Sequence, residues 1–172
     1  MNNIKSEAQA SYNWDYSLQE RALGASIKNA LNMLEQHFKN NPLLQNKNLQ
    51  FTNPEAVADY LVLSLALEKD EHFHVLFLDN QSRLIENNKM FSGTIDGAAV
   101  YPRVVARRAL EVNAASIILA HNHPSGVIEP SQADIKITAK LKSCLETFDI
   151  NVLDHFIVGG TKTYSFAEHG QI

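Results

Sequence analysis

The sequence predicts an α/β domain with a mixed sheet flanked by helices, preceded by an N-terminal helical extension. From about residue 50 onward, short apolar segments with strand character alternate with amphipathic segments of helical period. One apolar segment, ASIILA at residues 115–120, is uninterrupted, which is typical of a strand buried on both faces. Apolar residues make up 45% of the 172 residues, which is enough to form a sizeable core.

Residues 1–49 predict an extension made of a helix and a linker, and residues 50–172 predict one domain. The helix covers residues 17–39, where Ser17 and Glu20 form a capping-box pattern and apolar residues then recur at helical spacing. The polar segment KNNPLLQNKN that follows is typical of a linker. Helical arms of this kind pack on a neighbouring domain or a partner more often than they contain catalytic residues. The helix could therefore mediate a homodimer.

The elements of the domain follow from local signals. Pro54 suits the first position of a helix, where no N–H is needed, and Asn53 or Thr52 can cap that helix. The turn residues DNQS separate two strand-like segments and therefore predict a hairpin. The expected elements are, in order, a helix from Pro54 to about Leu67, a hairpin of residues 71–78 and 83–91, a loop at 93–100, a helix opening near Pro102, the strand at 115–120, a helix at 130–148 and two strands around the GGTK turn within 150–170.

The composition narrows the classes of function. A net charge of −4 and a pI of about 5.9 argue against a protein whose main task is binding phosphate backbones. Arg103, Arg107 and Arg108 are typical of a solvated helix face, with a local basic patch as the alternative. The single cysteine, Cys144, excludes an intrachain disulfide and a cysteine-rich zinc site, and we expect it to pack in the core. No apolar signal segment or membrane span is recognisable, so we expect a cytoplasmic protein.

The motif AHNHPSGVIEPSQAD at residues 120–134 carries the strongest chemical signal. His121 and His123 follow the buried strand at positions that point to the same side, so both imidazoles can reach one ion. Ser131 is the expected N-cap of the next helix and places Asp134 in its first turn. Two imidazoles and a carboxylate with an open fourth position are typical of catalytic zinc. The alternative is a polar loop followed by an ordinary helix cap.

Two further histidine-containing motifs are present. His72 and His74 form a second His-x-His pair at the start of a strand, without a third ligand at a fitting distance, and we expect packed or exposed strand histidines there. Asp154 and His155 are neighbours near the C-terminus. Such a pair can orient a metal ligand from behind, and it can equally be structural, so both interpretations stay open.

The segments HNHPSG and PSQAD together resemble the JAMM metal-binding motif of the JAB/MPN superfamily. The surrounding sequence, over about residues 54–170, resembles the bacterial RadC-like branch of this superfamily. The segments that carry this resemblance are VLFLDNQSRLI, GTIDGAAVYPRVVARRALEVNAASIILAHNHPSG, VLDHFIVGG and YSFAEHG. The resemblance implies a JAB/MPN fold, distantly similar to the cytidine deaminases, with one zinc ion per chain. RadC itself has an N-terminal helix-hairpin-helix module, whose glycines are not evident here, so we expect a short RadC-like protein of the kind associated with mobile elements.

Carried over to this sequence, the resemblance makes His121, His123 and Asp134 the zinc ligands. A water molecule would take the fourth position, with its pKa lowered by the metal. Ser131 would donate a hydrogen bond to the oxyanion that forms when this water attacks a carbonyl group. The site would lie at the end of the buried strand.

The resemblance also implies a general base, a glutamate placed just before the first strand of the domain. In the segment DEHFHVLFLD this position selects Glu71, with Glu68 and Asp70 as close alternatives. The implied function is a zinc-dependent hydrolase that cleaves a peptide or isopeptide bond in a peptide or protein substrate. The alternative is a DNA-repair-associated or mobile-element protein with a non-peptidase role for the metal site, although the acidic net charge does not support nucleic-acid binding.

Overall fold

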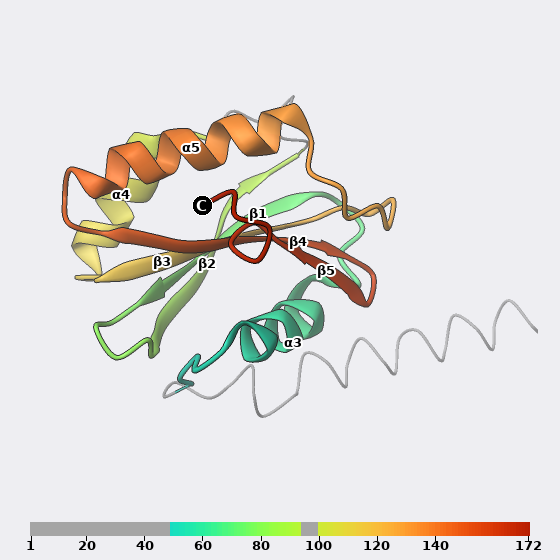
Figure 1. Ribbon diagram of the computed structural model, residues 1–172, viewed down its shortest axis with the longest axis horizontal. Coiled ribbons are helices and arrows are strands. Elements are labelled where there is room, and N and C mark those ends of the chain that lie inside the picture. The colour runs from blue at the N-terminus through green and yellow to red at the C-terminus, as the bar shows by residue number, and fades with distance from the viewer. Residues whose placement is uncertain (1–48, 94–99) are drawn as a thin grey trace, which may run out of the picture. The chain divides into compact units, whose positions relative to one another are not determined.

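The computed structural model describes residues 49–93 and 100–172, and it confirms the α/β class (Figure 1). The elements are α3 (Pro54–Leu65), β1 (His72–Leu78), β2 (Leu84–Ser92), α4 (Pro102–Glu111), β3 (Ser116–Asn122), α5 (Gln132–Glu146), β4 (Asn151–Gly159) and β5 (Lys162–Ser165). The helix expected at 17–39, the linker after it and most of the loop expected at 93–100 lie outside the described residues.

The strands form a five-stranded mixed sheet in the order β2-β1-β3-β4-β5. β1 pairs antiparallel with both β2 and β3, whereas β3 and β4 run parallel and are joined through α5. β5 returns antiparallel to β4 as the expected hairpin. The continuous apolar character of β3 fits its central position, because every residue of this strand is buried.

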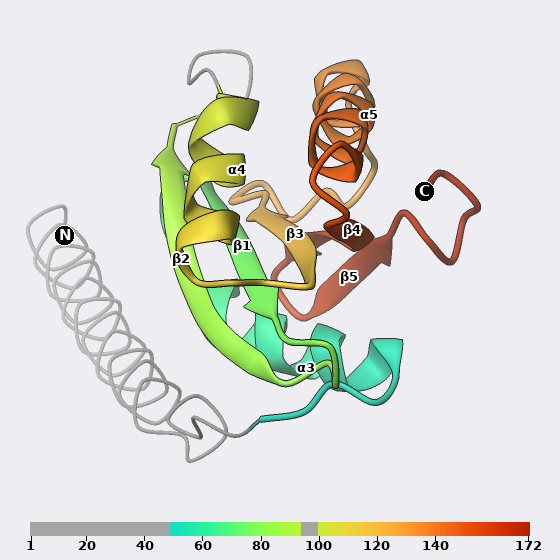
Figure 2. The same ribbon diagram turned by 90° about the vertical axis from the view of Figure 1, so that its left-hand side faces the viewer.

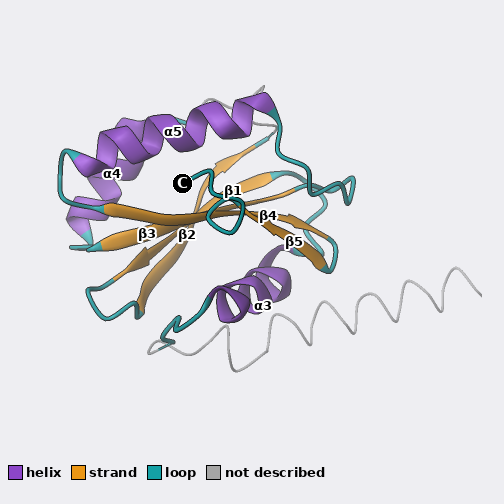
Figure 3. Ribbon diagram, in the orientation of Figure 1, coloured by secondary structure: helices purple, strands orange, loops and turns teal. Residues whose placement is uncertain are grey.

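Helices cover both faces of the sheet. α4 and α5 lie on one face and α3 lies on the other, as two perpendicular views show (Figures 2 and 3). The core is divided accordingly. Alternate residues of β3 face the two sides: Ile117 and Leu119 pack with α4 and α5, and Ile118 and Ala120 pack with α3.

Local signals explain where the helices begin. The side chain of Asn53 accepts a hydrogen bond from the backbone N–H of Ala56, 2.8 Å away, so Asn53 rather than Thr52 is the cap of α3. α3 ends at Leu65, two residues before the expected end, because a turn follows. None of the helices in the two described ranges combines the length and the apolar character that a membrane span requires.

Candidate metal centre

Four segments of the chain meet at one edge of the sheet. The parallel strands β3 and β4 both end there, and β1, which is antiparallel to β3, begins there. Phe73 pairs with His121 across β1 and β3, so the residues just before β1 lie beside the end of β3. The loop after β3 then leads into the N-terminus of α5. This topology explains why sequence-distant polar residues gather at one point.

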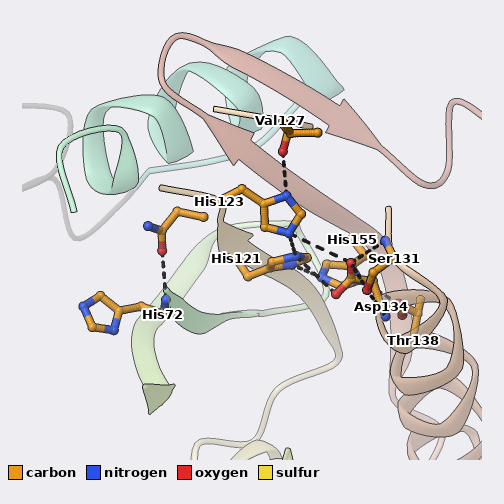
Figure 4. A network of polar contacts seen from close by, with 9 residues as sticks. His72, His121, His123, Val127, Ser131, Asp134, Thr138 and His155 are labelled. Atoms are coloured by element: carbon orange, nitrogen blue, oxygen red, sulfur yellow. Dashed lines mark hydrogen bonds and ion pairs between the residues drawn. The ribbon is translucent and has the colours of Figure 1, made fainter. Parts of the chain in front are cut away.

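The imidazole rings of His121 and His123 converge, as expected from their positions at the end of the buried strand. Nε2 of His121 lies 3.0 Å from Nε2 of His123. The carboxylate of Asp134 lies beside both rings, with Oδ1 3.3 Å from Nε2 of His121 and Oδ2 4.0 Å from Nε2 of His123. Figure 4 shows the three side chains pointing toward one another from β3, the loop after it and α5. The side chains of His121 and Asp134 are almost fully buried, whereas that of His123 is partly exposed to solvent.

Ser131 and Asp134 form the predicted capping box of α5. The backbone N–H and the hydroxyl of Ser131 each donate to Oδ2 of Asp134, both at 2.7 Å, and the serine oxygen accepts from the backbone N–H of Asp134 at 3.1 Å. Burial acts to raise the pKa of Asp134, but the contacts with His121 and then with Ser131 outweigh it and hold that pKa well below its ordinary value. Asp134 is therefore a carboxylate whose Oδ1 lies next to Nε2 of His121 and whose Oδ2 is held by Ser131.

Glu71 approaches the same two histidines from the start of β1. One oxygen of its carboxylate and one ring nitrogen of each histidine lie within 4.8 Å of one another. The side chain of Asn122 holds the peptide groups on both sides of Glu71: its Oδ1 accepts from the backbone N–H of His72 at 2.9 Å, and its Nδ2 donates to the carbonyl of Asp70 at 2.9 Å. The residue between the two histidines thus fixes the backbone position of Glu71.

The loop after β3 orients His123. Nδ1 of this ring lies 2.6 Å from the carbonyl oxygen of Val127, and the backbone N–H of His123 donates to the carbonyl of Val158 at 2.8 Å. Gly126 has a positive φ of 80°, which closes the turn between these residues. A carbonyl oxygen only accepts, so Nδ1 of this imidazole is the donor in that contact, and Nε2 is the nitrogen that faces His121 and Asp134.

His121 is held from behind by α5 and β4. Its Nδ1 lies 2.9 Å from Nε2 of His155, and Nδ1 of His155 lies 2.6 Å from the hydroxyl of Thr138. Complete burial lowers the pKa of His155 well below its ordinary value, and the neighbouring His121 lowers it further, so His155 is a neutral ring. The sequence left open whether His155 is structural or contacts a metal ligand. The structure places it in contact with His121, a candidate ligand.

Asp154, the neighbour of His155, does not share this contact. Its carboxylate accepts hydrogen bonds from the hydroxyl of Ser165 at 2.5 Å and from the backbone N–H of Ala167 at 2.9 Å. Asp154 therefore ties β4 to the end of β5 and to the turn after it, which is a structural role. Asp154 and His155 have different roles because the side chains of neighbouring residues in a strand point to opposite faces of the sheet.

The second His-x-His pair lies apart from the centre. In Figure 4 the side chain of His72 points away from the His121 ring. His74 contacts Asn87 on the neighbouring strand, with Nδ1 2.9 Å from the amide oxygen, and burial lowers its pKa. Among the described residues, the group of histidine and acidic side chains close enough to share an ion is the one with Glu71, His121 and His123.

The donor atoms at this centre fit a zinc ion. Imidazole nitrogen and carboxylate oxygen are the atoms that zinc prefers when cysteine is absent. Nε2 of His123 and the carboxylate of Asp134 lie beside Nε2 of His121, and the carboxylate of Glu71 lies close to both rings. A gathering of nitrogen and carboxylate donor atoms of this kind is stabilised by a cation. Beside His123 a pocket of about 160 Å³ opens between Leu65, Glu68 and the Pro124–Gly126 turn. The centre is therefore accessible from solvent on one side.

Comparison with known proteins identifies the family of this domain. The family model of the RadC-like JAB domain matches residues 51–171. A UPF0758 protein of Pseudoalteromonas translucida is 57% identical over 122 residues, which cover 71% of this chain and 54% of that protein. The UPF0758 protein YkfG of Escherichia coli is 49% identical over 144 residues, which cover 84% of this chain and 87% of that protein.

These relatives differ in how much of them the chain covers. It spans about half the length of the Pseudoalteromonas protein and of the similar Vibrio vulnificus protein, at 54% of each, but most of the length of YkfG. The residues that the family model matches, 51–171, contain all the strands of the mixed sheet. On the match over residues 51–171 and on these identities, the chain belongs to the RadC-like JAB domain family.

Proposed function

We propose that this chain is a zinc-dependent hydrolase of the JAMM type that cleaves a peptide or isopeptide bond in a protein or peptide substrate. The observation that carries the proposal is the convergence of His121, His123 and Asp134, with Nε2 of His121 3.0 Å from the second imidazole and 3.3 Å from the carboxylate. His121, His123 and Asp134 would hold one zinc ion per chain. Such an ion lowers the pKa of a bound water and polarises a substrate carbonyl.

Glu71 is the proposed general base. Its carboxylate lies next to the two histidines but belongs to the residue just before β1. Asn122 holds the backbone on both sides of it, so Glu71 can act on a proton without being displaced from the site. A carboxylate in this position accepts a proton from the attacking water and returns it to the leaving nitrogen. The alternatives differ in their surroundings: Asp70 is exposed and Glu68 lies 3.5 Å from Nε2 of His72, outside the histidine pair.

Ser131 is the proposed donor to the oxyanion. In the structure its hydroxyl donates to Oδ2 of Asp134. The backbone N–H of Ser131 donates to the same oxygen at 2.7 Å, so the carboxylate stays held when the hydroxyl turns toward a substrate. A donor that is already at the rim of the site requires little rearrangement during reaction, which is the condition for effective stabilisation of a developing charge.

The alternative, a nucleic-acid-associated role for the metal site, has less support. Two of the three arginines that could form a basic patch on α4 have acidic partners: Arg108 pairs with Glu86 and with Glu111, and Arg107 lies 3.7 Å from Glu111. A face that binds phosphate backbones needs unpaired cations.

The proposal is tested first by metal content. Elemental analysis of the purified, untagged chain should find about one zinc per chain, and the double variant His121→Ala/His123→Ala should contain none. His169→Ala is the control, because this histidine is exposed and belongs to the C-terminal turn. Zinc at full occupancy in the double variant would refute the site.

Hydrolysis is the second test. A peptide library with the zinc-loaded chain should yield a cleaved substrate, and Glu71→Gln should keep the zinc and abolish cleavage. Activity retained in Glu71→Gln but lost in Glu68→Gln would assign the base to Glu68. A zinc-loaded chain that cleaves no peptide or isopeptide bond but acts on a nucleic acid would favour the alternative function.

A further inference from the structure

The pocket beside His123 lies between the end of a helix and the turn after β3. Its volume is about 160 Å³, and its lining includes Leu65 and Ala66 at the end of α3, Glu68, and the turn Pro124–Gly126. Leu65 is buried and Ala66 is half-buried, so these two side chains give the pocket an apolar wall. An apolar side chain, or the aliphatic part of a longer one, can pack against this wall.

The lining of the pocket is also negatively charged. Glu68 supplies a carboxylate, and none of the described residues that line the pocket is a lysine or an arginine. This carboxylate lies 3.5 Å from Nε2 of His72, an imidazole that is charged only when protonated. α3 ends at the pocket without a basic residue in its last turn, and the free carbonyl groups at a helix C-terminus carry a partial negative charge. The carboxylate and the helix end both favour a cation.

The pocket adjoins the proposed reaction centre. His123, a candidate zinc ligand, is part of its lining, and so is Asn122, which holds the backbone on both sides of Glu71. A Cβ on Gly126 or Gly160, two glycines of the lining, would meet no atom within 4 Å, so the pocket is open beside these residues. A side chain that enters the pocket therefore belongs to a residue close to the bond at the metal centre.

We propose that this pocket selects a basic side chain, that of lysine or arginine, in the residue beside the bond that is cleaved. The aliphatic stem of this side chain packs on Leu65 and Val158, both of which are buried. Its cationic end lies with Glu68 and the C-terminus of α3. Acidic side chains are repelled by the same two features, and apolar side chains lack the charge that they attract.

The role of the pocket in cleavage rests on the proposed function, whereas binding to the pocket can be measured without zinc. ¹H–¹⁵N NMR of the full, metal-stripped chain, titrated with N-acetyl-lysine methylamide, should shift the backbone amides of Gly126 and Gly160. N-acetyl-norleucine methylamide has the same stem without the ammonium group and should bind about 3- to 10-fold more weakly, as expected for a partly exposed charge near a helix end. Equal affinities for the two probes, or shifts that spare both glycines, would overturn the inference.

Glu68→Gln removes the charge of the carboxylate and keeps the size of the side chain. This variant should lose most of the preference for the lysine probe over the norleucine probe. Glu55→Gln is the matched control, because Glu55 is an exposed glutamate in the first turn of the same helix and is not part of the pocket lining. It should keep the wild-type preference. An unchanged preference in Glu68→Gln would count against the assignment.

Cleavage by the zinc-loaded chain separates this inference from the proposed function. Peptides with lysine or arginine beside the cleaved bond should have the lowest KM, and Glu68→Gln should raise that KM about 3- to 10-fold more than the KM of norleucine peptides. A fall in kcat for every peptide alike would assign Glu68 to the reaction instead of the pocket. Cleavage without preference for a basic residue would overturn the pocket assignment and leave the hydrolase standing. Binding of the lysine probe without cleavage of any peptide would overturn the hydrolase and leave the pocket assignment standing.

Discussion

A methyl group on Gly159 would lie 2.6 Å from the carbonyl oxygen of Gly126, closer than a Cβ atom approaches a carbonyl oxygen without displacing it. The end of β4 is therefore in direct contact with the turn after His123. The same hypothetical methyl would also lie 2.8 Å from the side chain of Ile128, so the loop is contacted at two points. Because the carbonyl of Val127 in this loop orients His123, the packing at Gly159 affects the geometry of the candidate metal centre.

Gly159→Ala should therefore weaken metal binding as well as stability. The added methyl must push the loop outward, which should cost about 1–3 kcal/mol of unfolding free energy, as overpacking does. The displaced loop should orient His123 less well and lower the affinity for Zn²⁺ by about tenfold or more. Competition with a zinc chelator measures the affinity, and urea unfolding measures the stability.

Gly160→Ala is the control for this prediction. A Cβ at Gly160 meets no atom within 4 Å, but the residue has a φ of +61°, so alanine is strained there by about 1 kcal/mol. Gly160→Ala should lose stability without losing Zn²⁺ affinity. Equal affinities of the two alanine variants would show that the contact of Gly159 with the loop does not position His123.

Asn122→Ala should affect the proposed general base, Glu71, but not the proposed zinc ligands. The substitution leaves the backbone N–H of His72 and the carbonyl of Asp70 without their buried partner, which should cost about 1–3 kcal/mol in stability. The imidazole of His121 lies on the other face of β3, and that of His123 belongs to the loop after the strand. Zinc should therefore remain at about one per chain while cleavage falls, because Glu71 loses its fixed position.

Asn88→Ala serves as the control for the Asn122 variant. Asn88 lies on β2, and its amide donates to the carboxylate of Glu86 at 2.6 Å, so its removal should change neither zinc content nor cleavage. If Asn122→Ala lost zinc together with activity, Asn122 would support the ligands rather than the base.

The local geometry of the candidate site could be predicted where the sequence signals were local. The spacing of His121 and His123 at a strand end dictates that both rings point to one side, and the Ser131–Asp134 pattern dictates a capped helix. These two features were sufficient to expect the convergence of three side chains. The order of helices and strands could likewise be predicted, because the spacing of apolar residues differs between a helix and a strand.

The remaining parts of the site could not be read from the sequence because they depend on pairing between distant segments. The contact of Thr138 with His155 needs α5 and β4 to be packed in one register, although its position four residues after Asp134 places it on the same helix face. Val127 acts through its backbone carbonyl, which no residue type reveals. From the sequence, Asn122 is only the residue between two histidines. Its hydrogen bond to the backbone of His72 depends on the pairing of β1 with β3.

Ser131→Ala should affect both the stability and the metal. Loss of the cap should lower the free energy of unfolding by about 0.5–2 kcal/mol. The carboxylate of Asp134 would also lose one of the two donors from Ser131 to its Oδ2, so the affinity for Zn²⁺ should fall as well. Asn53→Ala removes the cap of α3 and should give a similar loss of stability at unchanged Zn²⁺ affinity. If both variants bound zinc equally, Ser131 would be a cap without a part in the metal centre.

The ion pair between Glu86 on β2 and Arg108 on α4 should make stability depend on pH. The hydrogen bond from Arg108 holds the pKa of Glu86 below its ordinary value of 4.5, so the unfolded chain binds this proton more readily than the folded one. Wild type should exceed Glu86→Gln in stability by about 0.2–1 kcal/mol at neutral pH, the range of partly exposed pairs. That difference should stay constant down to the ordinary pKa and shrink as the pH falls through the lowered one. Urea midpoints of both proteins across this range measure it, and a difference that is independent of pH would show that the pair contributes nothing through its charge.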